Sequence, residues 1–302
     1  MKTDRSFNRI FPVPARITVL FLVSVCVLMT SCDQKQSGEQ MDLFSRENLV
    51  AWCIVPYDNQ NRTPLERADM LNELGLSHFA YDWRPEHLPS FSEEIHVMRE
   101  HHVEIYAVWF WISGEGKGLL DANNQVILKI LDENQVQTRL WVSFSDMFFN
   151  GLSDSEMFKK AKDAVEQLYK RADEIGCTIA LYNHGGWFGD PVNQIRIIQE
   201  LEKDIGIVYN FHHAHAQIDK FPQLLNAMLP YLETVNINGM SKDGPKILTV
   251  GQGENELEML KALASSGYQG AIGILGHVKD GDVKDVLEEN LTGLDSLAAL
   301  IN

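Results

Sequence analysis

The strongest constraint on the fold is a regular alternation of short apolar segments with longer amphipathic segments from residue 48 onward. The apolar segments are rich in β-branched residues and predict strands, whereas the longer segments carry helix signals such as the N-cap Thr63 and the helix-ending Gly75 and Gly176. Strands are expected at 49–55, 77–81, 103–111, 139–143, 178–183, from 206 onward, 233–237 and 268–275. Helices are expected at 64–74, 92–101, 121–133, 154–175, 191–204, 221–229, 254–265 and 282–300.

Eight strand–helix units in succession imply a parallel sheet, because each helix carries the chain back to the start of the next strand. In a chain of one-domain size, eight units favour a closed barrel over an open doubly wound sheet. No Gly-x-Gly-x-x-Gly opens a helix, so a Rossmann dinucleotide site has no support. We therefore predict a single (β/α)8 TIM barrel, an α/β fold, over residues 48–302.

The first 31 residues have the pattern of a secretory signal. Basic residues precede an apolar run at 17–29 that is short for a transmembrane helix, and small residues and Cys32 follow it. The Met-Thr-Ser-Cys ending is typical of a bacterial lipobox, with Cys32 as the lipidated first residue of the mature protein; an uncleaved anchor and ordinary signal cleavage are the alternatives. Residues 32–47 are expected to be a tether. The prediction is an exported protein, lipid-anchored to a bacterial membrane on its periplasmic or cell-surface side.

Composition limits the possible partners. The formal net charge is −16 at pH 7, and the expected signal contains more basic than acidic residues, so the remainder is more acidic still. Such a chain repels phosphate backbones, and nucleic acid is not an expected partner. Cys53 and Cys177 lie next to predicted strands, where they are expected to be small buried hydrophobes rather than a disulfide.

Four predicted strands of the second half end in bursts of His, Asn and Gly, at 178–186, 206–215, 234–240 and 271–277. The carboxyl ends of the strands in an α/β barrel share one face, and that face holds the active site. Since strand residues alternate faces, Tyr182 and His184 should share one side and Asn183 should take the other. The four bursts therefore predict one convergent polar pocket.

Residue chemistry assigns candidate roles within this pocket. Histidine suits proton transfer near neutral pH, and asparagine can hold a substrate oxygen as donor or acceptor. The candidate catalytic residues are His184, Asn210 and His213, and the candidate substrate-binding residues are Asp82, Arg84, Trp109, Asn183, Asn236, Asn238 and His277. Structural alternatives remain open for several of them: His212 and His215 as packing or surface residues, Asn236 and Asn238 as partners of rim backbone, and Asp82 with Arg84 as an ion pair.

These segments resemble the xylose isomerase-like barrel superfamily, which includes sugar phosphate isomerases/epimerases and AP endonucleases. The resemblance spans roughly residues 48–277 and is strongest at the Gly-Gln-Gly turn of 251–253 and the Gly-Tyr-Gln-Gly entry of 267–270. Tyr182-Asn183-His184 is similar to the Glu-Asn-His ending of the family's fifth strand. Asn210-Phe-His-His213 is similar to the Asp-x-x-His ending of its sixth strand.

The resemblance implies a divalent metal, held in the family by Glu, Asp, His and Glu at the ends of strands five to eight. Here Tyr182 and Asn210 stand where the first two acids are expected, no acid occurs in 274–277, and His213 is retained. Two alternatives remain: a metal bound through His184, His213 and His277, or a site without metal.

The first functional hypothesis is a sugar isomerase- or epimerase-like enzyme that abstracts a proton next to a carbonyl of a sugar or keto-sugar. A related elimination or hydrolysis of keto-glycosides belongs to the same hypothesis. His184 or His213 would be the base, and Asn210 and Asn238 would stabilise the enolate oxygen. The alternative is a lipid-anchored carbohydrate-binding protein with a degenerate, metal-free site. An AP endonuclease-like nuclease is opposed by the acidic charge and the export signal.

Overall fold

The computed structural model describes residues 42–115 and 118–301, and the expected signal, its lipobox Cys32 and most of the expected tether lie outside them. The strands are β1 (Leu49–Trp52), β2 (His78–Tyr81), β3 (Glu104–Ile112), β4 (Arg139–Phe144), β5 (Thr178–Tyr182), β6 (Gly206–Asn210), β7 (Leu232–Ile237) and β8 (Ala271–Leu275). The α-helices are α1 (Pro64–Glu73), α2 (Phe91–Glu100), α3 (Ala122–Glu133), α4 (Asp154–Asp173), α5 (Pro191–Leu201), α6 (Phe221–Met228), α7 (Glu256–Ser265) and α8 (Val283–Ile301).

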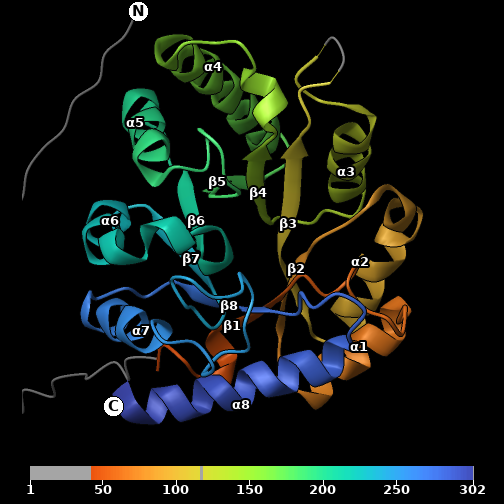
Figure 1. The fold of residues 1–302 in the computed structure, drawn as a ribbon. Helices are drawn as coiled ribbons and strands as arrows, with labels where there is room; N and C mark the ends of the chain where they lie inside the picture. Colours follow the sequence, from red (N-terminus) through yellow and green to blue (C-terminus); the bar gives the residue numbers. More distant parts are fainter. Residues whose placement is uncertain (1–41, 116–117, 302) are drawn as a thin grey trace, which may run out of the picture. The chain divides into compact units, whose positions relative to one another are not determined.

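The eight strands form a closed barrel in chain order, so the predicted (β/α)8 fold is confirmed. Every neighbouring pair is parallel, and β8 closes the barrel against β1 through pairs such as Val50 with Gly273. Figure 1 shows the helices as a ring around the strands. All strands therefore present their carboxyl ends on one face of the barrel.

Local sequence signals fix where the helices begin. Thr63 and Ser153 each form a capping box with the glutamate three residues later, and Asp121 forms one with Asn124. These side chains satisfy the free N–H groups of a first helical turn. Short 3-10 segments precede or follow several elements, at Arg46–Asn48, Pro85–Ser90, Asp146–Phe149, Phe211–His213 and His215–Lys220.

Two layers of apolar side chains hold the barrel. The larger lies between the strands and the helices, and the smaller fills the barrel interior with Val50, Ala180, Val208 and Trp141. Packing begins before the expected boundary at residue 48, because Phe44 is buried and Asn48 donates a hydrogen bond to the Leu43 carbonyl. The compact unit therefore includes the last residues of the expected tether.

Several expected boundaries are corrected at strand ends. The first strand stops at Trp52 instead of residue 55, because Cys53 takes a left-handed conformation with φ of 58°. The last strand begins at Ala271 instead of residue 268, since Tyr268 instead bonds through its hydroxyl to the Glu233 and Ala271 carbonyls. Within the described part of the chain, no helix is long and apolar enough to cross a membrane.

Candidate functional site

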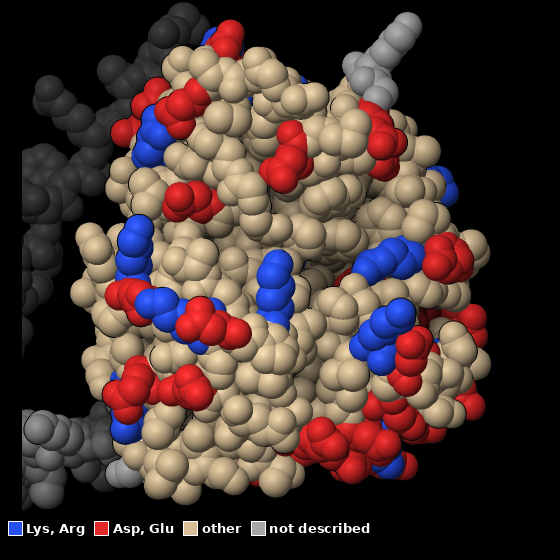
Figure 2. Space-filling model, in the orientation of Figure 1, with Lys and Arg blue, Asp and Glu red and all other residues tan. Residues whose placement is uncertain are grey.

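A hollow opens among the carboxyl ends of the strands and holds about 420 Å³ of empty space, part of it open to solvent. Figure 2 shows the molecule hollowed near the centre of this view. The lining residues come from β1, β2, β3, β5, β6 and β8 or the turns after them: Trp52, Cys53, Tyr57, Asp82, Arg84, Trp109, Tyr182, His184, Asn210, His212, His213, Leu275 and His277.

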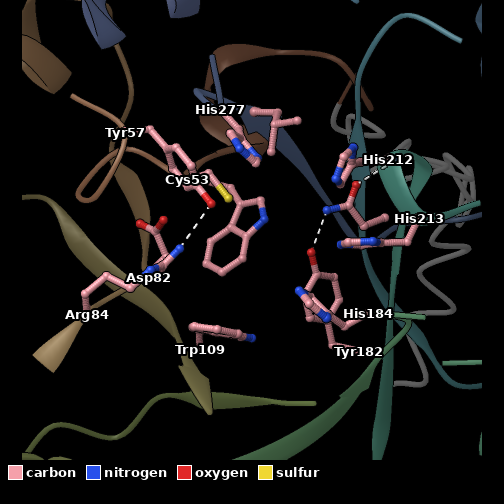
Figure 3. Close-up of a pocket in the computed structure, with 13 residues that line it drawn as sticks. Cys53, Tyr57, Asp82, Arg84, Trp109, Tyr182, His184, His212, His213 and His277 are labelled. Carbon is pink, nitrogen blue, oxygen red and sulfur yellow. Dashed lines mark hydrogen bonds between the residues drawn. The ribbon is translucent and has the colours of Figure 1, made fainter. Parts of the chain in front are cut away.

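One wall of the pocket is built from the ends of β5 and β6. Tyr182 and His184 both face the hollow, as strand alternation predicts, and the rings of His184 and His213 lie 4.5 Å apart between centroids. His212 lies 4.5 Å from His213 and 5.7 Å from His277 by the same measure. The polar strand ends thus converge, and they gather four histidines around one space (Figure 3).

Burial keeps these histidines neutral. Loss of solvation, together with neighbouring His212 and Arg84, lowers the pKa of His184 to about 4 and that of His277 to about 4. Desolvation likewise lowers the pKa of His213 to about 2, followed by the influence of His184. At pH 7 each imidazole therefore offers one free lone pair, which can accept a proton or a hydrogen bond.

The opposite wall comes from the ends of β1 and β2, where Cys53, Tyr57, Asp82 and Arg84 lie together (Figure 3). Asp82 is 2% exposed; its Oδ1 accepts a hydrogen bond from the Val55 N–H at 3.3 Å, and its Oδ2 has no partner within the described residues. Burial raises the pKa of Asp82 to about 7, although the nearby Arg84 opposes that shift. A carboxyl in this state exchanges a proton near neutral pH and can serve as acid or base.

Arg84 and the aromatic residues complete this wall. One Arg84 terminal nitrogen donates to the Tyr57 hydroxyl at 3.1 Å, and the guanidinium carbon lies 5.2 Å from the centroid of Trp109. The His277 ring packs against the Tyr57 ring at a tilt of 33°, with centroids 3.6 Å apart. Asp82, Arg84, Trp109 and His277 thus lie where the sequence predicts a ligand pocket.

Three asparagines predicted to bind substrate lie elsewhere. Asn183 points away from the hollow and exchanges two hydrogen bonds with the backbone of Asn210, at 2.6 and 3.1 Å. Asn238 donates to the Gly239 and Lys246 carbonyls, so it fixes the loop after β7. Asn236 is fully buried against Gly273, where a Cβ would meet its Oδ1 at 1.7 Å. None of the three lines the hollow, and their predicted role in binding substrate stays a prediction.

Sequence reasoning also missed four lining residues, Trp52, Cys53, Tyr57 and Leu275. A signal for the first three exists in the chain, because Trp52 ends β1 and every barrel strand ends on the same face. The first strand is not followed directly by a burst of His, Asn or Gly, so its end gives a weaker signal than the strand ends of the second half of the chain. Leu275, at the end of β8, carries no polar group and gives no chemical signal.

The sequence matches a known family of barrels. A model of the family described as xylose isomerase-like TIM barrel matches residues 127–297. The chain therefore belongs to the xylose isomerase-like TIM barrel family, as its motifs predict. No functionally curated protein matches the sequence.

Solved structures of the same fold have low sequence identity. A 3-keto-D-glucoside 4-epimerase from E. coli superposes with a TM-score of 0.62 and 17% identity, over 83% of this chain and 99% of that one. A D-psicose 3-epimerase superposes with a TM-score of 0.64 and 10% identity, over 84% of this chain and 99% of that one. The third structure is a xylose isomerase-like barrel protein from Mycobacterium smegmatis in complex with magnesium. It superposes with a TM-score of 0.57 and 14% identity, over 85% of this chain and 97% of that one. Likeness at these identities establishes the fold.

The donor set does not fit the divalent metal that the family resemblance implies. Hard cations need anionic oxygen ligands, but Tyr182 and Asn210 occupy the ends of β5 and β6 and hydrogen-bond to each other at 2.6 Å. The alternative set of His184, His213 and His277 is not assembled either, since His277 packs on Tyr57 at the far side of His212. Across residues 42–115 and 118–301, no three His, Cys, Asp or Glu side chains are arranged to hold a metal ion.

Proposed function

We propose that this protein is a sugar epimerase- or isomerase-like enzyme that moves a proton next to a carbonyl without a bound metal. The observation that carries the proposal is a pair of opposed walls, with neutral imidazoles on one side and the protonatable carboxyl of Asp82 on the other. Stereochemical inversion at carbon needs a proton acceptor on one face and a proton donor on the other, and two such walls meet that need. Two solved proteins of the same fold are sugar epimerases, which supports the substrate class.

The chemistry can be assigned to residues of this chain. His184 or His213 takes the proton from the carbon next to the carbonyl, breaking the C–H bond and leaving an enolate. Asp82 then gives its proton to the opposite face, forming the new C–H bond, and both groups return to their starting states by exchange with solvent. General acid–base catalysis of this kind contributes about 10²- to 10⁴-fold in rate. Asn210 and Arg84 orient the substrate oxygens.

Deuterium exchange tests the proposal even when the product is not identified. The protein is incubated in D2O with a panel of keto-sugars that includes a 3-keto-glucoside, D-fructose and D-psicose, and deuterium uptake next to the carbonyl is followed by NMR. The wild type is expected to exchange at least one of them, and His184→Asn, His213→Asn and Asp82→Asn to lose most of that exchange. His96→Asn, a change on the exposed face of α2, is the matched control.

A second candidate function is a carbohydrate-binding protein with a degenerate site, favoured by the Tyr182–Asn210 pair in place of the expected acids. Saturable sugar binding with no deuterium exchange for any keto-sugar would support this function and contradict the enzyme proposal.

We further propose that the barrel is exported and held at a bacterial membrane through lipid on Cys32. The signal-like segment 1–31 supports this proposal. Cys32→Ser is expected to move the protein from the membrane fraction to the soluble fraction and to abolish labelling by a radioactive fatty acid. Unchanged membrane association of that variant would contradict lipidation.

A further inference from the structure

Arg84 is the one partly buried arginine of the described residues that has no acidic partner. Eight arginines lie in residues 42–115 and 118–301. Six of them have a carboxylate within 4.0 Å, namely Arg46, Arg62, Arg67, Arg139, Arg171 and Arg196. Arg99 is exposed on α2 and donates to the Asn134 carbonyl, so water can solvate its charge. Arg84 is the partly buried exception, and it lines the pocket.

The Arg84 guanidinium is held in place by neutral groups. One terminal nitrogen donates to the Trp83 carbonyl at 2.7 Å and the other donates to the Tyr57 hydroxyl at 3.1 Å. The guanidinium carbon lies 5.6 Å from the centroid of Tyr57 and 5.2 Å from that of Trp109. Guanidinium has five N–H donors, so the remaining ones have no protein partner within the described residues. Because the guanidinium group is already held in one orientation, it loses little conformational entropy when a ligand binds.

The charge of Arg84 is not neutralised inside the pocket. Asp82 is the one carboxyl among the lining residues; it forms no ion pair with Arg84 within 4.0 Å, and burial keeps it partly protonated at pH 7. The positive charge of Arg84 is felt across the pocket, where it helps to lower the pKa of His184 and His277. A partly buried cation without a counter-ion is costly, and a bound anion would relieve that cost.

We propose that the natural ligand is a sugar acid whose carboxylate binds Arg84, an inference that rests on the proposed sugar site. A planar carboxylate matches the guanidinium fork and can accept two parallel hydrogen bonds from it. A phosphate carries more charge, and the lining offers no second lysine or arginine to balance it. The ligand class is therefore a uronate or a related carboxylated sugar.

Calorimetric titration of the full chain tests the proposal with three pairs of probes: D-glucuronate against D-glucose, D-galacturonate against D-galactose, and D-gluconate against D-glucitol. At least one acid is expected to bind roughly ten- to hundredfold more tightly than its neutral partner, the usual range for a charged hydrogen-bonded contact. Arg84→Gln should remove that preference, and Arg84→Lys should keep part of it. Arg99→Gln, which changes an arginine outside the pocket that also forms no ion pair within the described residues, should leave the preference intact. Thermal melting shows whether each variant is folded.

Four outcomes would overturn the proposal. The first is equal affinity for each acid and its neutral partner, and the second is no binding of any acid at millimolar concentration. The third is a preference for the acid that persists in folded Arg84→Gln. The fourth is tighter binding of D-glucose 6-phosphate than of any sugar acid. The proposed function fails separately. Deuterium exchange of a neutral keto-sugar, without a preference for sugar acids, would contradict only the Arg84 inference. Arg84-dependent binding of a sugar acid, without deuterium exchange of any keto-sugar or keto-acid sugar, would contradict only the proposed enzyme activity.

Discussion

Tyr182 and Asn210 are joined side chain to side chain across the ends of β5 and β6, where the Asn210 amide nitrogen donates to the Tyr182 hydroxyl at 2.6 Å. The other end of the amide is used as well, because its oxygen accepts from the His212 N–H at 2.9 Å. Asn210 therefore links the strand end on one side to the turn that carries His212 and His213 on the other. Both side chains are buried, with exposed fractions of 2% for Tyr182 and 1% for Asn210.

Tyr182→Phe should destabilise the protein, because it leaves the buried Asn210 amide without an acceptor. An unsatisfied buried donor costs about 1–3 kcal/mol, and the free energy of unfolding in urea should fall by that amount. Tyr169→Phe, on the partly exposed face of α4, is the matched control and should change it by less than about 0.5 kcal/mol. Equal effects of the two changes would show that the Tyr182–Asn210 bond contributes nothing.

Turnover of any active keto-sugar should decline as the pH rises above 7. Burial raises the pKa of Asp82 to about 7, and the proposed step consumes the proton that Asp82 loses above that value. The acid-side decline should lie near pH 4, where His184 becomes protonated. The measurement is kcat/KM against pH, and Asp82→Asn should be slow, with no decline near 7.

Glu233→Gln is the control for the Asp82 prediction. Burial raises the pKa of Glu233 to about 7 as well, but this residue lies near the start of β7, beside Arg139 at the start of β4. Its removal should leave the pH profile unchanged. A profile that keeps its alkaline decline in Asp82→Asn would assign the titration to another group.

The pocket histidines should weaken the fold in acid. Desolvation lowers the pKa of His184 to about 4, below the value near 6.5 of an unfolded chain, so the unfolded state binds more protons between these values. The contribution is fully present above pH 6.5 and is lost as the pH falls toward 4. His184→Asn should therefore gain stability relative to the wild type on going from pH 7.5 to 4.5, on the order of 2 kcal/mol. A pH-independent difference between the two proteins in urea unfolding would contradict this account.

Two adjacent glycines after β5 should respond differently to alanine. Gly185 and Gly186 both have positive φ, at 97° and 63°, so both substitutions strain the backbone. A Cβ on Gly186 would lie 1.8 Å from the Asp146 Oδ1, whereas a Cβ on Gly185 would have nothing within 4 Å. Gly186→Ala should lower the melting temperature more than Gly185→Ala. The reverse order would show that contact with Asp146 does not decide the cost.

The barrel and the histidine wall were predictable because both follow from periodicity. Alternation along β5 places Tyr182 and His184 on one face, and all strand ends meet on one side of the barrel. The roles of Asn183, Asn236 and Asn238 were not predictable in this way, since an amide on a strand end can bind backbone as readily as a ligand. The contacts of these side chains depend on neighbouring strands and loops that spacing alone does not place.

Cys53 shows a different limit of sequence reasoning. Its left-handed φ of 58° ends β1 early, and the turn that follows places Cys53 and Tyr57 on the pocket lining. Few residues other than glycine, asparagine and aspartate adopt this conformation, and a cysteine gives no signal of it. Cys53 and Tyr57 therefore join the predicted residues Asp82 and Arg84 in this wall only once the chain is folded.

The indole rings of Trp52 and Trp109 form part of the pocket surface. Indole emission responds to the polarity and water content around the ring, so a ligand that displaces water from these two side chains alters the light that they emit. Trp52 also meets Trp141 of the barrel interior edge to face, with ring centroids 4.9 Å apart. Intrinsic tryptophan fluorescence therefore reports on ligand binding in the pocket, and titration of the unlabelled protein can show which sugars bind there.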